Sequence, residues 1–405
     1  MSINAAVPEI AIFQPVPKEK SVEKIYWVEQ RPTSQISDKG PIEFVIAGTS
    51  PDYVCLDKTY LHTKVKITNA DGSDLVAPSG IPENVGMVNL SQSSLFRQVD
   101  VTLNQQIINP SVGTNYAYKS YIDVLLNYNH SVKEGQLQAE GFYKDAAFSF
   151  DRYGNTGHTK RMEWTRESRI HDMEGLLHVD LAQQHRAIPN GVEIGVKLFQ
   201  ASDEFRIFSG QTIAVPPPDG SPEGTPPSEA PYTDYKLTIV EATLKVAYMK
   251  LTPSVLLGHN NGFKIAPAIY PYWKSVVKTF GIPKGNRSFT IENPHNGHKP
   301  TSFVVGFVKS SAHSGSMLTS PFNFQHFFLN FLEFTVDGVS VPGAPLQPQY
   351  TYNPSETNPP KTYLNGYVSE YKRLFGGDYP QKDGNFIHLG NNNPSLVKYL
   401  VHKHS

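Results

Sequence analysis

A pattern of ten residues occurs twice in this sequence and constrains the fold more than any other feature. The first copy is Phe96–Gln105 (FRQVDVTLNQ) and the second is Leu329–Gly338 (LNFLEFTVDG). Both copies alternate apolar and polar residues, which is typical of a strand with one buried face. Each then reaches a turn-forming residue, Asn104 or Asp337. The apolar positions align as Phe96/Leu329, Val99/Leu332, Val101/Phe334 and Leu103/Val336. The pattern predicts a strand and a tight turn in each half of the chain.

A helical pattern follows each copy of the repeat. Apolar and aromatic residues recur at helical spacing in Tyr116–Leu126 and again in Tyr363–Leu374. This repeated order of strand, turn, strand and helix favours internal duplication over a chance match between two amphipathic strands. Duplication implies two β domains of similar plan. About 125 residues separate the first helix from the next connector, but only about 30 follow Leu374. The second domain therefore either closes differently or is truncated.

Strand patterns occupy much of the remaining chain, and the composition agrees with them. Of 405 residues, 21 are Tyr, 22 Phe, 30 Gly and 32 Pro, which favours β structure with many turns over a helical bundle. Only 18% are charged, and together with the aromatic content this excludes a wholly disordered chain. We predict an all-β protein with strands at 42–47, 60–67, 96–103, 176–181, 192–199, 235–248, 273–280, 303–308 and 329–336.

Proline-rich and irregular stretches set the predicted domain limits. Residues 1–25 contain several prolines among scattered apolar residues and are predicted to be an extended arm. The first β domain is expected at 26–252, a connector at 253–272 and the second β domain at 273–405. Residues 215–231 hold too many prolines for a strand ladder, so they are predicted to form an exposed loop of the first domain.

Common catalytic motifs do not fit this sequence. Gly258–Lys264 has the wrong spacing for a phosphate loop and lacks the Ser or Thr that binds magnesium. Ala312–Ser316 does not match the Gly-x-Ser-x-Gly turn of hydrolases and is predicted to be a flexible loop. We therefore predict no catalytic residues and no enzymatic activity.

Three groups of residues resemble ligand sets but fail on spacing. The first group recurs every seven residues, at His171, His178 and His185. A strand at 176–181 would place successive histidines on opposite faces and about 23 Å apart, too far to share an ion. His295 and His298 share a turn that offers no third ligand, and Asp378–Gly384 lacks the ligand spacing of a calcium loop. We predict no metal and no cofactor.

The charge balance argues against a nucleic-acid or membrane partner. The 36 Lys and Arg against 37 Asp and Glu give a formal net charge of −1, so no long-range field attracts polyanions. A weak basic cluster consists of Lys160, Arg161, Arg166 and Arg169. Glu163 and Glu167 lie between these residues, so we expect a solvated loop that pairs its own charges rather than a sequence-specific nucleic-acid site.

The expected compartment is the inside of a cell. The single cysteine, Cys55, excludes an intrachain disulfide. The first residues lack the pattern of a signal peptide, and no apolar run approaches the roughly 20 residues of a membrane helix. Sequons at Asn89, Asn129 and Asn286 mean little without a secretory route.

Several segments resemble one known family. They are Ser94–Asn104, Tyr116–Leu126, Phe142–Asp145, Lys236–Leu244, Leu251–Val255 and Pro321–Phe324. Over residues 40–375, approximately, the chain resembles the major capsid proteins of Polinton (Maverick) elements and of the related adintoviruses. The resemblance implies two tandem jelly rolls, each of eight strands, with short helices in the loops. Members of that family continue through further strands, so the resemblance leaves the closure of the second roll open.

The same resemblance implies a structural role in a virion. Three chains would form a homotrimeric, pseudo-hexagonal capsomer, and capsomers would build an icosahedral shell with minor or penton proteins at its vertices. Two alternatives remain at this point. One is a jelly-roll module that binds carbohydrate or a receptor, favoured if Tyr and Trp gather on one loop face. The other is a minor vertex capsid protein, against which the duplication argues.

Overall fold

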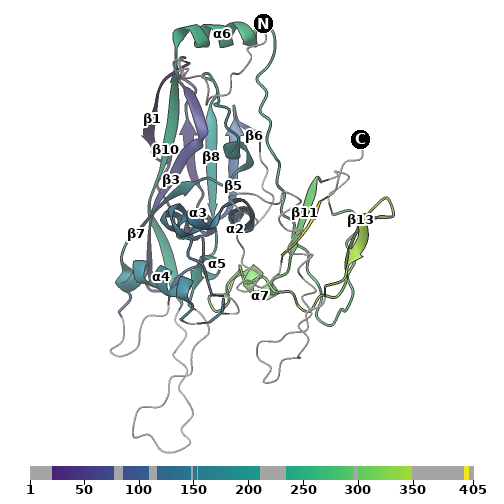
Figure 1. The fold of residues 1–405 in the computed structure, drawn as a ribbon. Coiled ribbons are helices and arrows are strands. Elements are labelled where there is room, and N and C mark those ends of the chain that lie inside the picture. Colours follow the sequence, from purple (N-terminus) through teal and green to yellow (C-terminus); the bar gives the residue numbers. More distant parts are fainter. Residues whose placement is uncertain are drawn as a thin grey trace, which may run out of the picture.

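The N-terminal part of the chain is a sandwich of two antiparallel sheets (Figure 1). The computed structural model describes residues 21–76, 85–108, 116–146, 149–152, 154–209, 234–294, 300–348 and 396–400. The first sheet has the order β1 (Val22–Gln30), β10 (Tyr235–Leu251), β3 (Tyr53–Asn69) and β7 (His171–Leu176). The second has the order β2 (Ile42–Ile46), β8 (Ile194–Gln200), β5 (Phe96–Leu103) and β6 (Gln106–Ile107).

The order of these eight strands defines a jelly roll. Counted along the chain from first to eighth, the strands form one sheet in the order 1-8-3-6 and the other in the order 2-7-4-5. All pairs within the two sheets are antiparallel. This arrangement is the eight-stranded double Greek key of a jelly roll. A short pair, β4 (Gly86–Met87) and β9 (Ile207–Phe208), lies outside the two sheets.

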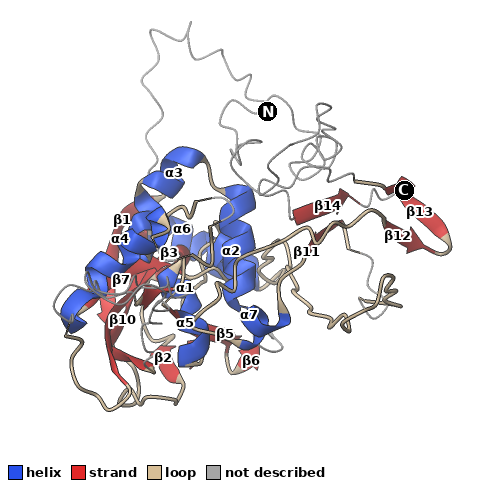
Figure 2. Cartoon of the chain, turned by 90° about the horizontal axis from the view of Figure 1, so that it is seen from below, coloured by secondary structure: helices blue, strands red, loops and turns tan. Residues whose placement is uncertain are grey.

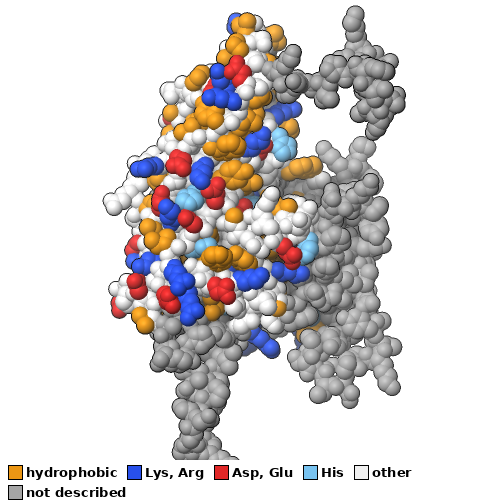
Figure 3. Space-filling view, turned by 60° about the vertical axis from the view of Figure 1, so that its left-hand side comes forward, with side chains coloured by type: hydrophobic (Ala, Val, Ile, Leu, Met, Phe, Trp, Pro, Cys, Tyr) orange, Lys and Arg blue, Asp and Glu red, His pale blue; other side chains and the backbone are white. Residues whose placement is uncertain are grey.

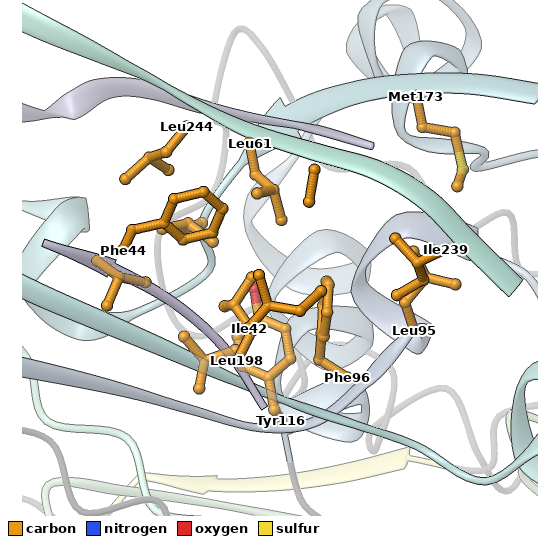
Figure 4. Close-up of a cluster of buried hydrophobic side chains, with 14 of the residues drawn as sticks. Ile42, Phe44, Leu61, Leu95, Phe96, Tyr116, Met173, Leu198, Ile239 and Leu244 are labelled. Carbon is orange, nitrogen blue, oxygen red and sulfur yellow. The ribbon is translucent and has the colours of Figure 1, made fainter. Parts of the chain in front are cut away.

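Alternating side chains from both sheets fill the interior of the roll (Figure 4). Phe44 on β2, Val65 on β3 and Leu198 on β8 are completely buried. Strands with period-two patterns direct one set of side chains inward, and each large apolar side chain buried contributes about 1.5–3 kcal/mol. The alternation noted in the sequence is therefore the alternation between core and surface in this roll.

Short helices lie in the loops between the strands. The longer ones are α2 (Tyr116–Asn127), α4 (Thr156–Thr165) and α6 (Pro253–Phe263). The others are α1 (Ser91–Ser94), α3 (His130–Glu134), α5 (Asp203–Arg206), α7 (Ser310–Ser314), η2 (Gln136–Glu140), η3 (Arg166–Ser168) and η4 (Asp180–Gln183). Helix α2 buries Tyr116 in the main core and Tyr121 and Val124 in a second apolar cluster. The predicted helix after the first repeat is therefore confirmed.

The repeated pattern forms a hairpin in each half. β5 turns into β6 through Asn104 and Gln105, whose φ angles are 47° and 67°. β12 (Leu332–Val336) turns into β13 (Val339–Leu346) through Asp337 and Gly338, with φ angles of 51° and 78°. Two consecutive positive φ angles are typical of the tight hairpin turn that matches strand twist. Equivalent pairs form at the same offset along the chain: Leu103 with Gln106 and Val336 with Val339.

The described part of the second half is also β structure. β11 (Ser302–Gly306) pairs with β14 (Leu396–Leu400), and β12 pairs with β13. Leu346 is buried there against Phe303, Leu332 and Phe334. Figures 1 and 2 show these strands beside the first roll, on the side of α2 and α7. The predicted all-β class with short helices in the loops is confirmed.

Three expectations about local structure need correction. The strand predicted at 176–181 is wrong, because β7 ends at Leu176 and residues 180–183 form a short helix. The strand predicted at 273–280 is extended but has no ladder among the described residues. β1 begins at Val22, inside the predicted arm. Residues 1–20, the loop at 215–231 and the second helical pattern at 363–374 lie outside the described residues.

Both turns predict that glycine is favoured at the second turn position, Gln105 in the first hairpin and Gly338 in the second. We expect Gln105→Gly to raise the free energy of unfolding by about 1 kcal/mol, because glycine adopts a positive φ without the steric cost of a side chain. The reverse change in the second hairpin, Gly338→Gln, should lower it by a similar amount. Urea unfolding of the full chain measures both. An unchanged midpoint in both variants would contradict the turn geometry.

Candidate interaction surface

The residues that most resembled catalytic motifs lie in helices. Gly258–Lys264 covers the end of α6 and the residue after it, where the His259 ring lies 3.0 Å from the Tyr53 hydroxyl. Residues 312–314 belong to α7, so the flexible loop predicted at 312–316 is wrong. Ala312 is buried, and the His313 ring stacks on Tyr118 with centroids 5.5 Å apart. These contacts join parts of the chain that are distant in sequence.

The three histidines at a spacing of seven have three separate environments. His178 is buried and its Nε2 lies 3.0 Å from Glu140 Oε2. The His185 Nδ1 atom lies 3.1 Å from Asp57 Oδ2, and His171 stacks on Trp164. Across the described ranges, no three His, Cys, Asp or Glu side chains lie close enough to hold a metal ion. His295, His298 and the 378–384 segment lie outside those ranges.

The weak basic cluster divides into a buried part and an exposed part. Arg161 is buried on α4, and its Nη2 atom lies 3.0 Å from Asp145 Oδ1. It also donates to the Met87 carbonyl, and Asn89 donates to the same Asp145 carboxylate. The prediction of a solvated loop is therefore wrong at Arg161. It is correct for Arg166 and Arg169, which both pair with Glu167 at the surface.

Polar contacts and aromatic rings hold the second half of the chain against the first roll. Asp151 accepts hydrogen bonds from the Ser320 amide and the Asn323 side chain, both at 2.9 Å. Phe322 is buried and stacks on Tyr121 of α2, with centroids 4.1 Å apart and planes at 2°. The second apolar cluster of the first roll is therefore completed by residues that follow α7.

A long extended segment, residues 264–294, runs from α6 along the first roll toward β11 (Figure 1). It is attached to the roll at individual residues. Tyr270 donates to the Ala187 carbonyl at 3.1 Å, and the Ser275 amide donates to Asp180 at 3.0 Å. Asp180 is in turn paired with Lys119 of α2 at 2.9 Å. The segment has a fixed place on the roll although residues 267–283 belong to no helix or strand.

Large apolar side chains are exposed along the extended segment. Trp273 is 78% exposed, Ile269 69% and Ile265 88%. The full set of exposed large hydrophobic residues in it is Ile265, Ile269, Trp273, Val276, Phe280, Ile282, Phe289 and Ile291. Exposed apolar side chains that gather on one part of a protein commonly mark an interaction site. The sequence predicted a strand at 273–280 but gave no sign of this exposure.

The outer face of the first sheet has a different character. Ion pairs cross its strands between Lys64 and Glu241, Lys245 and Glu174, and Lys250 and Glu23. Such exposed pairs each contribute little to stability, but they keep the face hydrated. Figure 3, which brings the β1 side forward, shows charges of both signs interspersed with hydrophobic side chains. The extended segment, not this face, is the candidate interaction surface.

Burial shifts the pKa of two groups inside the first roll. Burial raises the pKa of the Cys55 thiol to about 11, so the thiol stays protonated and unreactive. Burial lowers the pKa of Lys133 to about 8, with the nearby Lys144 adding to the effect. The Lys133 ammonium donates to the Leu125 carbonyl at the end of α2 at 2.7 Å.

No described helix has the length and apolar character needed to cross a membrane.

The comparisons with known proteins find partial similarity. No family model matches the sequence. An uncharacterized protein of Caenorhabditis elegans is 23% identical over 324 residues, which cover 78% of this chain and 70% of that protein. Three solved structures are similar in part. A chain of the Sputnik virophage is 10% identical with a TM-score of 0.41, and the match covers 62% of this chain and 53% of that one. The mavirus major capsid protein is 9% identical with a TM-score of 0.32, covering 75% of this chain and 54% of that one, and the Faustovirus major capsid protein is 8% identical with a TM-score of 0.33, covering 61% and 57% of the two chains. This chain spans little more than half the length of those structures.

The buried Lys133 predicts a specific pH dependence. Its folded pKa lies below the ordinary lysine value, so between about pH 8 and pH 10 the unfolded chain binds more protons and this group adds stability as pH rises. We expect Lys133→Met to be stabilising at pH 7, with that advantage shrinking by about 2 kcal/mol at pH 9.5. Urea unfolding of both proteins at the two pH values measures the difference. The exposed Lys39→Met serves as the control, and an equal pH response in both variants would contradict the prediction.

Proposed function

We propose that this chain is a structural protein of a viral-type capsid, and that its function is self-assembly rather than catalysis. One observation carries the proposal: a complete jelly roll is followed in the same chain by a second β unit that repeats the β5–β6 hairpin in the same register. A jelly roll pairs most strand edges within two facing sheets. It is therefore a rigid block, and its loops are free to differ at contacts between subunits.

The proposed assembly is a homotrimer that forms pseudo-hexagonal capsomers of an icosahedral shell. Two jelly rolls in each of three chains would supply the six blocks of such a capsomer. Minor or penton proteins would occupy the vertices, and the protein would be made in the host cell and located in the virion. The resemblance of Ser94–Asn104 and Tyr116–Leu126 to Polinton and adintovirus capsid proteins supports the same assignment.

The domain limits belong to this proposal. The arm toward neighbouring subunits would comprise residues 1–21, because β1 begins at Val22, and the first roll would span residues 22–252, with the loop at 215–231 facing outward. Residues 253–272 would connect it to the second roll at 273–405. This connector would begin with the helix α6 and continue into the extended chain after it.

The placement of the tryptophans does not favour a carbohydrate-binding module. Trp27 lies on β1, Trp164 on α4 and Trp273 in the extended segment. The Trp27 indole donates to the Lys58 carbonyl, and the Trp164 indole donates to the Tyr143 hydroxyl. Sugar binding by stacking needs aromatic rings gathered on one face, whereas these three rings lie on separate elements.

The mass of the purified full chain in solution tests the proposal. We expect light scattering at two concentrations to give a stable species near three times 45.1 kDa. Specific subunit interfaces bury more than about 1,000 Å², enough to persist on dilution. A monodisperse monomer at both concentrations would contradict the capsid assignment. Glycan-array binding by that monomer would then favour the binding-module alternative.

A further inference from the structure

Helix α6 lacks most of the local interactions that stabilise a short helix. It has 11 residues, among them Gly258, Gly262 and two asparagines, and isolated helices shorter than about 12 residues are marginal in water. Apart from Pro253 at its start, the ends of the helix are not favourable either. Thr252 makes no side-chain cap, the first turn carries no acidic residue and the last turn no basic residue. The helix therefore depends on packing.

The described residues supply little of that packing. Helix α6, which lies across the end of the first roll in Figure 1, has no buried residue. Leu257 and Phe263 are 63% and 43% exposed, and Ile265, just beyond the helix, is 88% exposed. The His259 ring lies 3.0 Å from the Tyr53 hydroxyl, which fixes the helix to the roll at that point. A partner for the exposed apolar side chains therefore lies outside the described residues.

The N-terminal arm meets the roll where α6 begins. The Ser21 carbonyl accepts a hydrogen bond from the Thr252 amide at 3.0 Å, and the next ladder pair joins Val22 to Leu251. Because β1 and β10 are antiparallel, the chain before β1 and the chain after β10 leave the sheet at the same end. Residues 1–20 are therefore tethered beside α6, and a short tether gives the arm a high effective concentration at this helix.

The sequence of the arm suits an uncharged apolar helix. Ile10, Phe13 and Val16 recur every third residue, and prolines on both sides of Val16 favour the polyproline II conformation. Since that conformation has three residues per turn, these three side chains would share one face. Residues 10–17 hold no Lys, Arg, Asp or Glu, and neither does α6. The two segments therefore match in chemistry.

The lengths of the two segments match as well. Val16 lies five residues before Ser21, which is about 16 Å along a polyproline II helix. Phe263 lies eleven residues after Thr252, which is about 16 Å along an α-helix. Both segments start from the hydrogen bond between Ser21 and Thr252, so Val16 reaches the level of Phe263.

Other partners suit α6 less well. Helices that bind lipid surfaces are commonly rich in Lys and Arg on their polar face, and nucleic-acid sites depend on the same residues, which α6 lacks. A second copy would offer the outer face of its first sheet, but ion pairs such as Lys64–Glu241 cross the strands there and keep that face hydrated.

We propose that residues 10–17 of the N-terminal arm pack along α6 of the same chain, with the apolar face of the arm against the helix. The contact would cover Phe263 and Ile265 and would hold the helix in place. It concerns the single chain and is independent of the proposed assembly. Within that assembly it would leave residues 1–9 as the part of the arm that can reach a neighbouring subunit.

Disulfide trapping in the full chain tests the docking. We expect Val16→Cys/Phe263→Cys to cross-link at least about tenfold faster than Gln14→Cys/Phe263→Cys, because position 14 lies off the apolar face of the arm. In a flexible arm the two tethers are of similar length, so the two rates would agree to within about twofold. Cys55 is buried and does not compete. A denaturing gel without reductant separates cross-links within one chain from those between two.

Amide exchange of α6 tests whether the arm stabilises the helix. Phe13→Ser/Val16→Ser should speed the exchange of residues 257–263 by at least about tenfold, because the helix loses its cover, and should leave β10 unchanged. Ala5→Ser/Val7→Ser is the matched control. It makes two changes to serine in the part of the arm outside the docked residues, and it should leave both elements unchanged.

Contrary results overturn the proposal in distinct ways. Equal cross-linking from positions 14 and 16 would show that the arm does not dock. Cross-links between chains would assign the contact to a second copy and overturn docking within one chain. Exchange of α6 that ignores Phe13→Ser/Val16→Ser would show that something else covers the helix. A stable trimeric mass would still support the capsid assignment in each case, so the two proposals fail separately.

Discussion

The pairing of β10 with both β1 and β3 holds the first roll closed. β10 is the eighth strand along the roll, yet it lies between the first and third strands: β3 pairs with it along nearly its whole length, and β1 pairs with its second half, Leu244–Leu251. The pairing of β10 with β1 closes a loop of about two hundred residues. Loop closure has an entropic cost, and the hydrogen bonds of both ladders together with burial of the core offset it. Leu244 and Ile239 of β10 are buried in that core, so closing the sheet and burying the core are one event.

Residues of the second half of the chain complete an apolar cluster beside the first roll. Tyr121 stacks on Phe322, and Asp151 holds Ser320 and Asn323, so the apolar cluster beside α2 is complete only when residues after α7 are in place. The buried Arg161–Asp145 pair reinforces the same end of the roll. Removing one member of such a pair costs about 3–5 kcal/mol because it leaves a buried charge unpaired. The halves are thus joined by specific contacts and not only by the connector.

Local pattern predicted the elements whose periodicity is set by burial. The strand at Phe96–Leu103 was predicted to the residue, because one face of β5 meets the core and the turn residue follows at once. Pattern failed where distant residues decide the structure. His178 was predicted to lie in a strand. It lies instead in irregular chain after β7, where its side chain pairs with Glu140 of η2. Arg161 looked solvated because Asp145 is sixteen positions away, across the turn that precedes α4.

The first ladder pair joins Val22 to Leu251, so the chain enters and leaves the first roll at the same place. A unit whose two ends lie side by side can be duplicated in tandem with only a short linker, because the chain leaves the unit close to the point where it entered. This geometry makes gene duplication an inexpensive route from one roll to two. The connector between such units can therefore be short, and contacts such as those of Asp151 with Ser320 and Asn323, rather than the length of the connector, hold the following β unit against the roll.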